Sequence, residues 1–322
     1  MSSPDDRSSP DDRSSVENRS KRAKPGEADK PALDPDAARR ILYQGEPGAN
    51  SHVACVNAYP EMEPGACPTF EDALIALRDR KARYAMIPIE NSVAGRVADV
   101  HHLLPGSGLY IVGEHFERIY HQLLVLPGAK REELKTIHSH THALGQCRKV
   151  IREMGLRPVI EADTAGAARM LSEEGDRTKA VIASRLAAEI YGLDILRGDI
   201  EDAAHNTTRF IVLSADREDA PSGNGPVVTT FIFRVRNVPA ALYKALGGFA
   251  TNGVNMTKLE SYMIEGNFSA TVFYADIEGH PDDRPVALAL DECGFFSSEF
   301  RVFGVYPASP FREHLRKQNG AD

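Results

Sequence analysis

A hydroxyl and a guanidinium lie side by side in the sequence, just before a predicted strand. Residues 205–210 read His-Asn-Thr-Thr-Arg-Phe and continue into the apolar run Ile211-Val-Leu213. Arginine offers a planar fork of hydrogen-bond donors, and threonine adds a donor that rotates. This combination suits a site that binds an anion and also handles a hydroxyl group. The first candidate residues are therefore Thr207, Thr208, Arg209 and Phe210.

Two glycine-containing loops are predicted to hold anions at the starts of helices. Gly45-Glu-Pro-Gly-Ala-Asn-Ser51 follows the predicted strand 41–43, and Asp163-Thr-Ala-Gly-Ala167 follows a later strand. Open α/β sheets bind ligands at the carboxyl ends of their strands, where glycine permits close backbone approach and helix N-termini offer free N–H groups. A small dianion could bridge the two loops. The alternative is that each loop is an ordinary strand-to-helix turn.

Other polar side chains are predicted to lie at strand ends. Glu90-Asn91-Ser92 follows the apolar strand 85–89 and combines a carboxylate, an amide and a hydroxyl, which need partners if buried beside a ligand. Ser139 is expected to cap a helix, and Gln146, seven residues later, then shares its face. The alternatives are a plain polar turn at 90–92 and a simple cap with a solvated glutamine.

The histidines and cysteines do not form a pattern typical of a metal site. His138, His140 and His142 alternate across a predicted strand-to-helix junction, which fits no ligand set, so no metal is expected. Cys147 lies on an apolar helix face and is predicted to be a core residue rather than a nucleophile. The four cysteines are widely spaced and form no C-x-x-C pair, which argues against a disulfide framework or a zinc knuckle.

The composition is that of an ordinary globular protein, with 42% hydrophobic and 26% charged residues among 322. Residues 1–40 hold nine Lys/Arg and nine Asp/Glu, so the net charge of −8 belongs to the remainder of the chain. An acidic body argues against broad nucleic-acid binding. No apolar run approaches the roughly 18 residues of a membrane span, and a secretory signal core is missing. We therefore expect a cytoplasmic protein without nucleic-acid or membrane partners.

Patterning divides the chain into five parts. Residues 1–37 are polar with near-repeated Ser-Ser-Pro-Asp-Asp-Arg units and are predicted to be a disordered tail. Residues 38–215 alternate apolar strands with helices, which predicts α/β lobes with sheets covered on both faces. A Gly- and Pro-containing linker is expected at 216–226. Residues 227–306 follow the order strand, helix, strand, strand, helix, strand of a ferredoxin-like βαββαβ unit, and 307–322 are predicted to be a C-terminal tail.

Taken together and in order, these motifs resemble the prephenate dehydratase family. The motifs are Gly45–Ser51, Ile87–Ser92, Ser139-His140 with Gln146, Asp163–Ala167 and Asn206–Phe210. The resemblance covers about residues 40 to 306. It implies a two-lobed catalytic domain of the periplasmic-binding-protein type with its site in the cleft, no cofactor, and conversion of prephenate to phenylpyruvate in phenylalanine biosynthesis.

The same resemblance implies roles for individual residues. Thr208 would assist departure of the hydroxyl group, with Glu90, Asn91, Ser139 and Gln146 as the other catalytic positions. Arg209 would hold a carboxylate or brace the lobe, and Glu90 would be protonated by burial or act structurally. The expected substrate-binding residues are Gly48, Ala49, Asn50, Ser51, Thr164, Ala165, Gly166, Thr207, Arg209 and Phe210.

The βαββαβ unit resembles an ACT domain, which in this family binds phenylalanine as a feedback inhibitor. The expected effector-binding residues are Ala240, Ala241, Leu242, Asn255, Glu260 and Ser261. Two motifs depart from the family pattern: Ala240 stands in place of glycine, and Tyr262-Met263 in place of Arg-Pro. Effector affinity or identity could differ, and the alternative is an ACT domain that only dimerises. The resemblance implies a homodimer or homotetramer.

Two other functions stay open at this point. An arogenate dehydratase would use nearly the same residues on a substrate that carries an amino acid in place of the keto acid. A non-catalytic metabolite sensor on the same fold would need the anion-binding loops but not Thr208. A fused chorismate mutase segment is not expected before residue 40.

Overall fold

The computed structural model describes residues 33–262 and 272–318 of the chain. Most of the predicted tail 1–37 lies outside them, as do Met263 and parts of the second and third strands predicted for the βαββαβ unit. Within the predicted tail, Pro35–Ala38 form the short helix α1, capped by the Asp34 side chain. Among the described residues no helix is long and apolar enough to cross a membrane.

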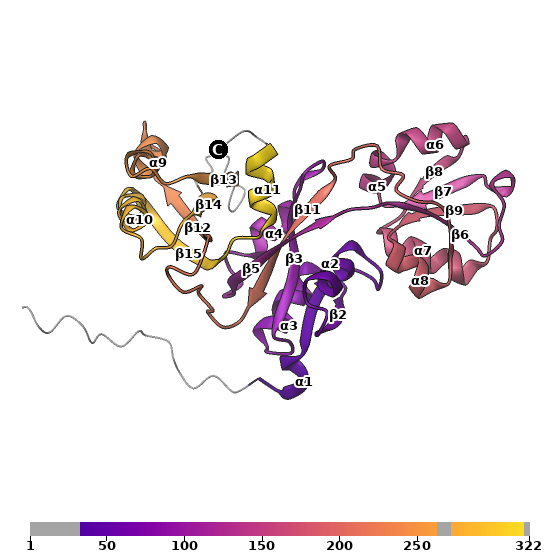
Figure 1. Ribbon diagram of the computed structural model, residues 1–322, viewed down its shortest axis with the longest axis horizontal. Helices are drawn as coiled ribbons and strands as arrows, with labels where there is room; N and C mark the ends of the chain where they lie inside the picture. The colour runs from indigo at the N-terminus through magenta and orange to yellow at the C-terminus, as the bar shows by residue number, and fades with distance from the viewer. Residues whose placement is uncertain (1–32, 263–271, 319–322) are drawn as a thin grey trace, which may run out of the picture. The chain divides into compact units, whose positions relative to one another are not determined.

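The first lobe is built on a mixed sheet with the strand order β2-β1-β3-β11-β5, with β4 paired to β3 (Figure 1). Its strands are β1 (Arg40–Gln44), β2 (Glu63–Cys67), β3 (Tyr84–Asn91), β4 (Gly95–Arg96), β5 (Tyr110–Arg118) and β11 (Thr207–Ser214). β1 is parallel to β2 and β3, whereas β11 is antiparallel to β3 and β5. Helix α2 (Asn50–Ala58) packs on one face, and α3 (Phe70–Arg78) and α4 (Ala98–Leu103) pack on the other.

The second lobe has a separate sheet with the order β10-β6-β9-β7-β8. Its strands are β6 (Gln122–Val125), β7 (Thr136–Ser139), β8 (Arg157–Ile160), β9 (Lys179–Ala183) and β10 (Asp194–Arg197). Its helices are the 3-10 turn η1 (Arg131–Glu133), α5 (Thr141–Gln146), α6 (Arg148–Met154), α7 (Thr164–Glu174) and α8 (Arg185–Tyr191). The chain enters this lobe after β5 and returns before β11. The predicted two-lobed α/β architecture is confirmed.

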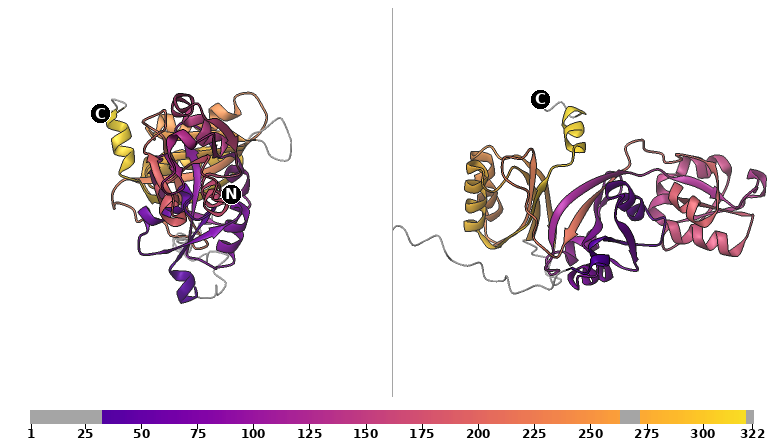
Figure 2. Two further views of the ribbon diagram at one scale, coloured as in Figure 1. Left: turned by 90° about the vertical axis from the view of Figure 1, so that its right-hand side faces the viewer. Right: turned by 60° about the horizontal axis from the view of Figure 1, so that its bottom comes forward.

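The third sheet is antiparallel and has the order β13-β14-β12-β15. The right-hand view of Figure 2 shows this orange and yellow unit with its helices together on one side of the sheet. Its elements are β12 (Val227–Val235), α9 (Ala241–Thr251), β13 (Met256–Tyr262), β14 (Val272–Glu278), α10 (Arg284–Phe296) and β15 (Ser297–Pro307). This is the predicted ferredoxin-like unit. Side chains alternate along β12, so Phe231 and Phe233 pack under the helices, whereas Val228 and Ile232 join the core of the first lobe.

The segment predicted to be a C-terminal tail contains helix α11 (Phe311–Gln318). Phe311 stacks on Phe116 of β5 with ring centroids 4.8 Å apart, and Arg312 Nε donates to Glu114 Oε1 at 2.6 Å. The predicted linker is also attached, because Ala220 N–H donates to the Val305 carbonyl at 2.7 Å. Both segments therefore hold the third sheet to the first lobe rather than trailing from it.

His101 of α4 is buried where this helix meets the third sheet. Its ring packs on Tyr274, and neither ring nitrogen has a hydrogen-bond partner among the described residues. Burial, together with the nearby charges of Lys258 and Arg96, lowers the pKa of His101 to about 4. The ring is therefore neutral at pH 7.

This histidine predicts a loss of stability in mild acid. As the pH falls from about 6.5 towards 4, His101 becomes protonated in the unfolded chain but stays neutral in the folded one. The free energy of unfolding therefore falls by up to about 3 kcal/mol across that window. Urea unfolding of the wild type and of His101→Phe at pH 7 and pH 5 measures this loss. The variant should lose less stability than the wild type on acidification, and equal losses would contradict the assignment.

Candidate active site

A cavity of ≈ 610 Å³ lies where both lobes meet the segments that connect them. Its walls come from the loop after β1, the end of β3, the turn into α4, the second lobe and β11. Residues that line it include Ala49, Asn50, Ser51, Asn91, Arg96, His121, Gln146, Thr164, Thr208 and Phe210. All of these except Arg96 and His121 are candidates from the sequence. The structure thus brings together residues from distant motifs.

Thr208 and Asn91 form the polar centre of the cavity. They are cross-strand partners on β11 and β3, and Asn91 Nδ2 donates to Thr208 Oγ1 at 2.9 Å. The Asn91 amide is oriented by its Oδ1, which accepts from the backbone N–H groups of Val93 and Ala94. Because Thr208 Oγ1 accepts from Asn91, its own hydroxyl hydrogen can be donated to a ligand oxygen. A donor of this kind stabilises an oxygen that gains negative charge.

A chain of hydrogen bonds extends from Asn91 to the second lobe. Asn91 Nδ2 donates to Asn206 Oδ1 at 2.9 Å, and Asn206 Nδ2 donates to Gln146 Oε1 at 3.0 Å. His121 Nε2 lies 2.7 Å from the same Gln146 oxygen. Burial lowers the pKa of His121 although the contacts to Gln146 and Glu201 raise it, so the neutral ring donates to Gln146. The network fixes Gln146 and Asn91 relative to Thr208.

The two predicted anion-binding helix N-termini differ in the structure. Helix α2 begins after Ala49 without a side-chain cap, so its first N–H groups lack an intrahelical partner beside the cavity. At α7, by contrast, the Asp163 carboxylate accepts from Gly166 N–H at 2.6 Å. A carboxylate already in place disfavours a second anion there. The start of α2 is therefore the better anion site.

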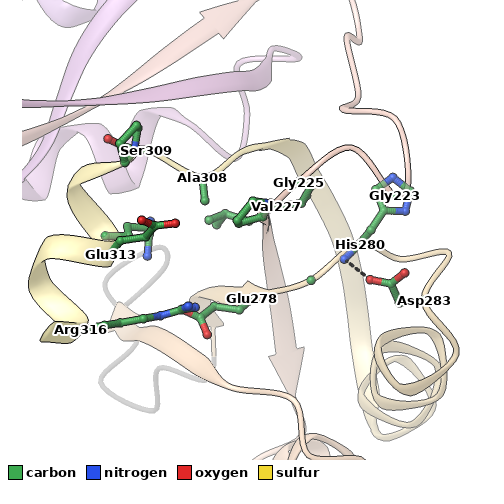
Figure 3. A pocket seen from close by; sticks show the side chains of 15 residues that line it. Gly223, Gly225, Val227, Glu278, His280, Asp283, Ala308, Ser309, Glu313 and Arg316 are labelled. Atoms are coloured by element: carbon green, nitrogen blue, oxygen red, sulfur yellow. Dashed lines mark hydrogen bonds and ion pairs between the residues drawn. The ribbon is translucent and has the colours of Figure 1, made fainter. Parts of the chain in front are cut away.

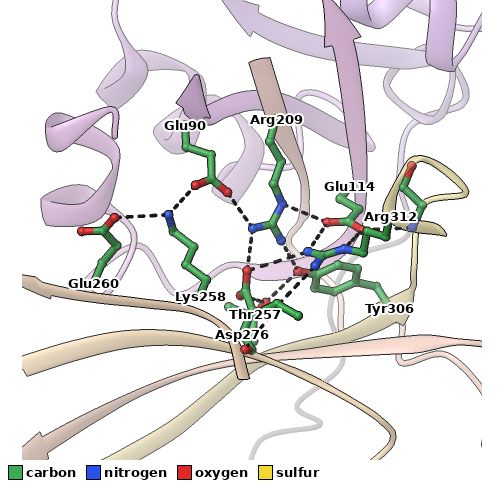
Figure 4. Close-up of polar contacts among 11 residues, drawn as sticks. Glu90, Glu114, Arg209, Thr257, Lys258, Glu260, Asp276, Tyr306 and Arg312 are labelled. Carbon is green, nitrogen blue, oxygen red and sulfur yellow. Dashed lines mark hydrogen bonds and ion pairs between the residues drawn. The ribbon is translucent and has the colours of Figure 1, made fainter. Parts of the chain in front are cut away.

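Arg209 does not line this cavity. Successive side chains of a strand point to opposite faces, and Arg209 points away from Thr208 towards the third sheet (Figure 4). Its guanidinium contacts Glu90 at 3.0 Å, Glu114 at 2.9 Å and Asp276 at 2.5 Å. With three carboxylates already bound, it braces the lobe. These contacts fit the bracing alternative rather than the expected role of holding a substrate carboxylate in this cavity.

Glu90 lies on the same face as Arg209 and is ionised rather than protonated. Burial raises its pKa, but Lys258 and Arg209 lower it more strongly, so the pKa falls below its usual value. Lys258 Nζ donates to Glu90 Oε2 at 2.5 Å. Of the two alternatives from the sequence, the structural role fits and protonation by burial does not.

Ser139 is not a helix cap. It is the last residue of β7, it is fully buried, and its hydroxyl donates to the Ile182 carbonyl at 2.7 Å. His140 caps α5 instead, and Gln146 ends that helix, so Ser139 and Gln146 do not share a helix face. Strand β7 extends one residue further than predicted because Ser139 pairs with Ile160 of β8.

Four other candidates lie beside the cavity without lining it. Gly48 has φ +88°, and a Cβ there would come within 2.7 Å of the Ala187 Cα, so this glycine is required by packing against α8. Ala165 and Gly166 are buried in α7. Thr207 precedes Thr208 on β11, so its side chain faces the opposite side of the sheet. Its backbone N–H donates to Ser92 Oγ at 3.0 Å.

Sequence reasoning missed Asn206 of the hydrogen-bond network and the lining residues His121 and Arg96. Asn206 directly precedes Thr207-Thr208-Arg209, and its position just before the strand could have indicated a site residue. His121 directly precedes the apolar strand β6, and a buried histidine needs a partner. Arg96 belongs to the two-residue strand β4, and its NH1 donates to the Ser261 carbonyl at 2.8 Å. No local pattern marks it.

The expected effector residues lie at two places on the third sheet. Ala240, with φ +63°, precedes α9, and Ala241 and Leu242 form its first turn. Asn255 donates to Glu278 at 2.9 Å, and Glu260 lies 3.4 Å from Lys258 and 3.8 Å from Arg96. Glu260 and Ser261 thus contact the first lobe.

A further pocket of ≈ 660 Å³ lies between the linker, the loop after β14 and α11 (Figure 3). Much of its charged lining is already paired, since Arg316 binds Glu278 and Asp283 accepts from His280 N–H. Away from these pockets, the four cysteines are free and buried, and Cys147 is a core residue as predicted. Within 33–262 and 272–318, no group of three or more potential ligands could hold a metal ion.

The family model for prephenate dehydratase matches residues 41–218. The chain belongs to the prephenate dehydratase family. It is 54% identical over 274 residues to a bifunctional N-acyl-homoserine lactone acylase/prephenate dehydratase of Komagataeibacter europaeus, covering 85% of this chain and 98% of the relative. It is 36% identical to arogenate dehydratase/prephenate dehydratase 1 of Arabidopsis thaliana, covering 84% and 73%.

Solved structures of prephenate dehydratases share the fold. The prephenate dehydratase of Arthrobacter aurescens in complex with L-Phe superposes with a TM-score of 0.76 at 28% identity, covering 87% of this chain and 98% of that one. The family match spans both lobes, including β3 and β11 with Asn91 and Thr208.

Proposed function

We propose that this chain converts prephenate to phenylpyruvate by combined decarboxylation and dehydration. The observation that carries the proposal is the Thr208 hydroxyl, which accepts from Asn91 and can donate into a cavity bordered by a free helix N-terminus. Membership in the prephenate dehydratase family supports it. The proposal assigns catalysis to residues 38–215 and regulation to an ACT domain at 227–306.

The reaction needs little beyond orientation and help for the leaving group. Prephenate carries two carboxylates and a ring hydroxyl. The bond to the ring carboxylate breaks to release carbon dioxide, its electron pair completes the aromatic ring, and the carbon–oxygen bond breaks. The departing oxygen is stabilised by the Thr208 hydrogen bond and leaves as water after protonation. Asn91 and Gln146 fix the geometry, while Ser139, Arg209 and Glu90 act outside the cavity.

Arg96 is proposed to bind a substrate carboxylate together with the N-terminus of α2. It is the arginine among the lining residues of the cavity, and it keeps donors beyond the one bound to Ser261. We expect Arg96→Met to raise KM by roughly tenfold or more, since a charge-assisted hydrogen bond contributes about 1.5–3 kcal/mol. Steady-state kinetics measure this. Arg185→Met is the control, and an unchanged KM for Arg96→Met would remove Arg96 from substrate binding.

Substrate choice is tested by incubating the protein separately with prephenate and with arogenate. Phenylpyruvate and phenylalanine, the two products, are separated by chromatography. Turnover of prephenate supports the proposal, and turnover of arogenate alone would make the chain an arogenate dehydratase. Absence of both products would leave the non-catalytic sensor as the better description.

We further propose that L-phenylalanine inhibits the enzyme through the residues 240–242, 255 and 260–261. The L-Phe complex of the Arthrobacter aurescens relative supports this. The sheet edges β13 and β15 are proposed to pair between subunits of a homodimer or homotetramer. Titration of phenylalanine tests the first claim, and no inhibition at any soluble concentration would remove it. Light scattering after gel filtration tests the second, and a monomer would refute it.

A second candidate activity is hydrolysis of N-acyl-homoserine lactones. The 54% identical relative carries this activity in its name, and a pocket of ≈ 620 Å³ lies on the face of β11 opposite Thr208. Phe116, Phe311 and Leu315 give it apolar walls that suit an acyl chain. Mass spectrometry of homoserine lactone released by the wild type and by Leu315→Asp tests the idea. It fails if no lactone is released or if Leu315→Asp releases as much as the wild type.

A further inference from the structure

The two strands that carry Asn91 and Thr208 present a different set of side chains on their other face. In the register of β3 and β11, Thr208 pairs with Asn91, and the next pair is Arg209 with Glu90. Because side chains alternate, the first pair faces the cavity and the second faces the third sheet. A register shift follows between Arg209 and Phe210, where β3 has one extra residue. The position of Asn91 therefore depends on how Glu90 is held.

The third sheet holds this second pair through ionic contacts. Asp276 of β14 binds Arg209, and Lys258 of β13 binds Glu90 Oε2 at 2.5 Å (Figure 4). Asp276 is completely buried, and the side chains of Arg209 and Lys258 are only 3% and 9% exposed. Asp276 is held in turn by Thr230, whose hydroxyl donates to it at 2.6 Å. The Glu90 side chain is 32% exposed, but every charge of the set is paired, which limits its freedom to shift.

Lys258 is distinctive within this set because it reaches Glu90 from the strand that carries Glu260 and Ser261. It lies two residues before Glu260 on β13 and contacts both carboxylates, Glu90 at 2.5 Å and Glu260 at 3.4 Å. A displacement of β13 therefore moves the partner of Glu90. The neighbouring Asn91 is the residue that donates to Thr208.

We propose that Lys258 is a positioning residue for the dehydration: through Glu90 it fixes the end of β3 so that Asn91 meets the Thr208 hydroxyl. This inference rests on the proposed function and assigns part of the catalytic geometry to the third sheet. A displacement of β13 would then alter the position of Asn91 through the contact between Lys258 and Glu90.

The test compares Lys258→Met, Lys258→Arg and the control Lys179→Met, whose lysine forms an exposed ion pair with Glu174 in the second lobe. All are assayed as full-length chains after thermal unfolding shows that they fold. Lys258→Met should lower kcat by roughly tenfold to a hundredfold with little change in KM, because misplacement of a reacting group by about 1 Å has such effects. Lys258→Arg should recover most of the activity, and Lys179→Met should match the wild type.

The double variant Lys258→Met/Glu90→Gln separates positioning from general damage. If Lys258 acts through Glu90, the double variant should lose no more activity than the worse single variant, because the two losses are not additive. A wild-type kcat in folded Lys258→Met, or a double variant whose losses multiply, would overturn the inference.

Hydrogen exchange followed by mass spectrometry provides a readout that does not need turnover. Peptides covering 88–92 and 206–210 should exchange faster in Lys258→Met than in the wild type and in Lys179→Met. Unchanged exchange in these peptides would overturn the inference even if the wild type showed no dehydratase activity. Absence of prephenate turnover by the wild type would instead refute the proposed function alone.

Discussion

Replacing Thr208 with alanine should lower kcat for prephenate by about 10²–10³-fold, the usual effect of removing one preorganised donor to a developing oxyanion. KM should change little, because the proposed binding groups for the substrate carboxylates are Arg96 and the N-terminus of α2. Asn91 Nδ2, which donates to Thr208 Oγ1 at 2.9 Å, would keep its bond to Asn206 in this variant. Steady-state kinetics and a binding measurement with prephenate separate the two effects.

Two further substitutions sharpen this prediction. Thr208→Ser keeps the hydroxyl and should retain much of the turnover. Thr208→Val keeps the shape but removes the hydroxyl, so it should resemble alanine. Equal kcat values for the valine variant and the wild type would show that the hydroxyl takes no part in the reaction.

Replacing Arg209 with methionine should lower the free energy of unfolding by about 3–5 kcal/mol, the usual effect of removing one partner from a buried ionic group. Asp276 and Glu114 are fully buried and would lose the cation between them. Burial alone raises the pKa of Asp276, and Arg209 is the main reason that it is lowered instead. Urea unfolding monitored by circular dichroism measures the loss.

Arg197→Met is the matched control for Arg209. Arg197 contacts Glu153 at 2.9 Å, but both side chains are about half exposed, so the expected loss is about 0–1 kcal/mol. If the two variants were equally stable, the charges around Arg209 would not be paired in solution. That outcome would also remove the structural basis for its bracing role.

Local patterns in the sequence predict most of the fold. Apolar runs such as Ala85–Ile89 and Phe210–Leu213 are buried strands because both faces of the first sheet are covered. Helix α11 was not predicted because it is mostly polar. The local indication of this helix is the apolar pair Phe311 and Leu315, which are one helical turn apart. This pair becomes informative only once its contact with Phe116, nearly 200 residues earlier, is known.

The site was only partly predictable for the same reason. Strand alternation alone implies that Thr208 and Arg209 cannot both face one cavity. Whether Thr208 or Arg209 faces the cavity depends on which side of the first sheet the third sheet packs against. No local sequence pattern predicts that side. Ser139 was misplaced because the end of β7 is set by its pairing with β8, not by its own sequence.

The charges shared by the first lobe and the third sheet restrict how this protein can be recombined with its relatives. Glu90, Glu114 and Arg209 come from one part of the chain, and Lys258, Asp276 and Arg312 come from the other. A chimaera that imports a C-terminal region without these partners would bury unmatched charge against the back of the catalytic strands. We expect such exchanges to succeed only when the whole set is inherited together, so the C-terminal unit of this chain is not an interchangeable module.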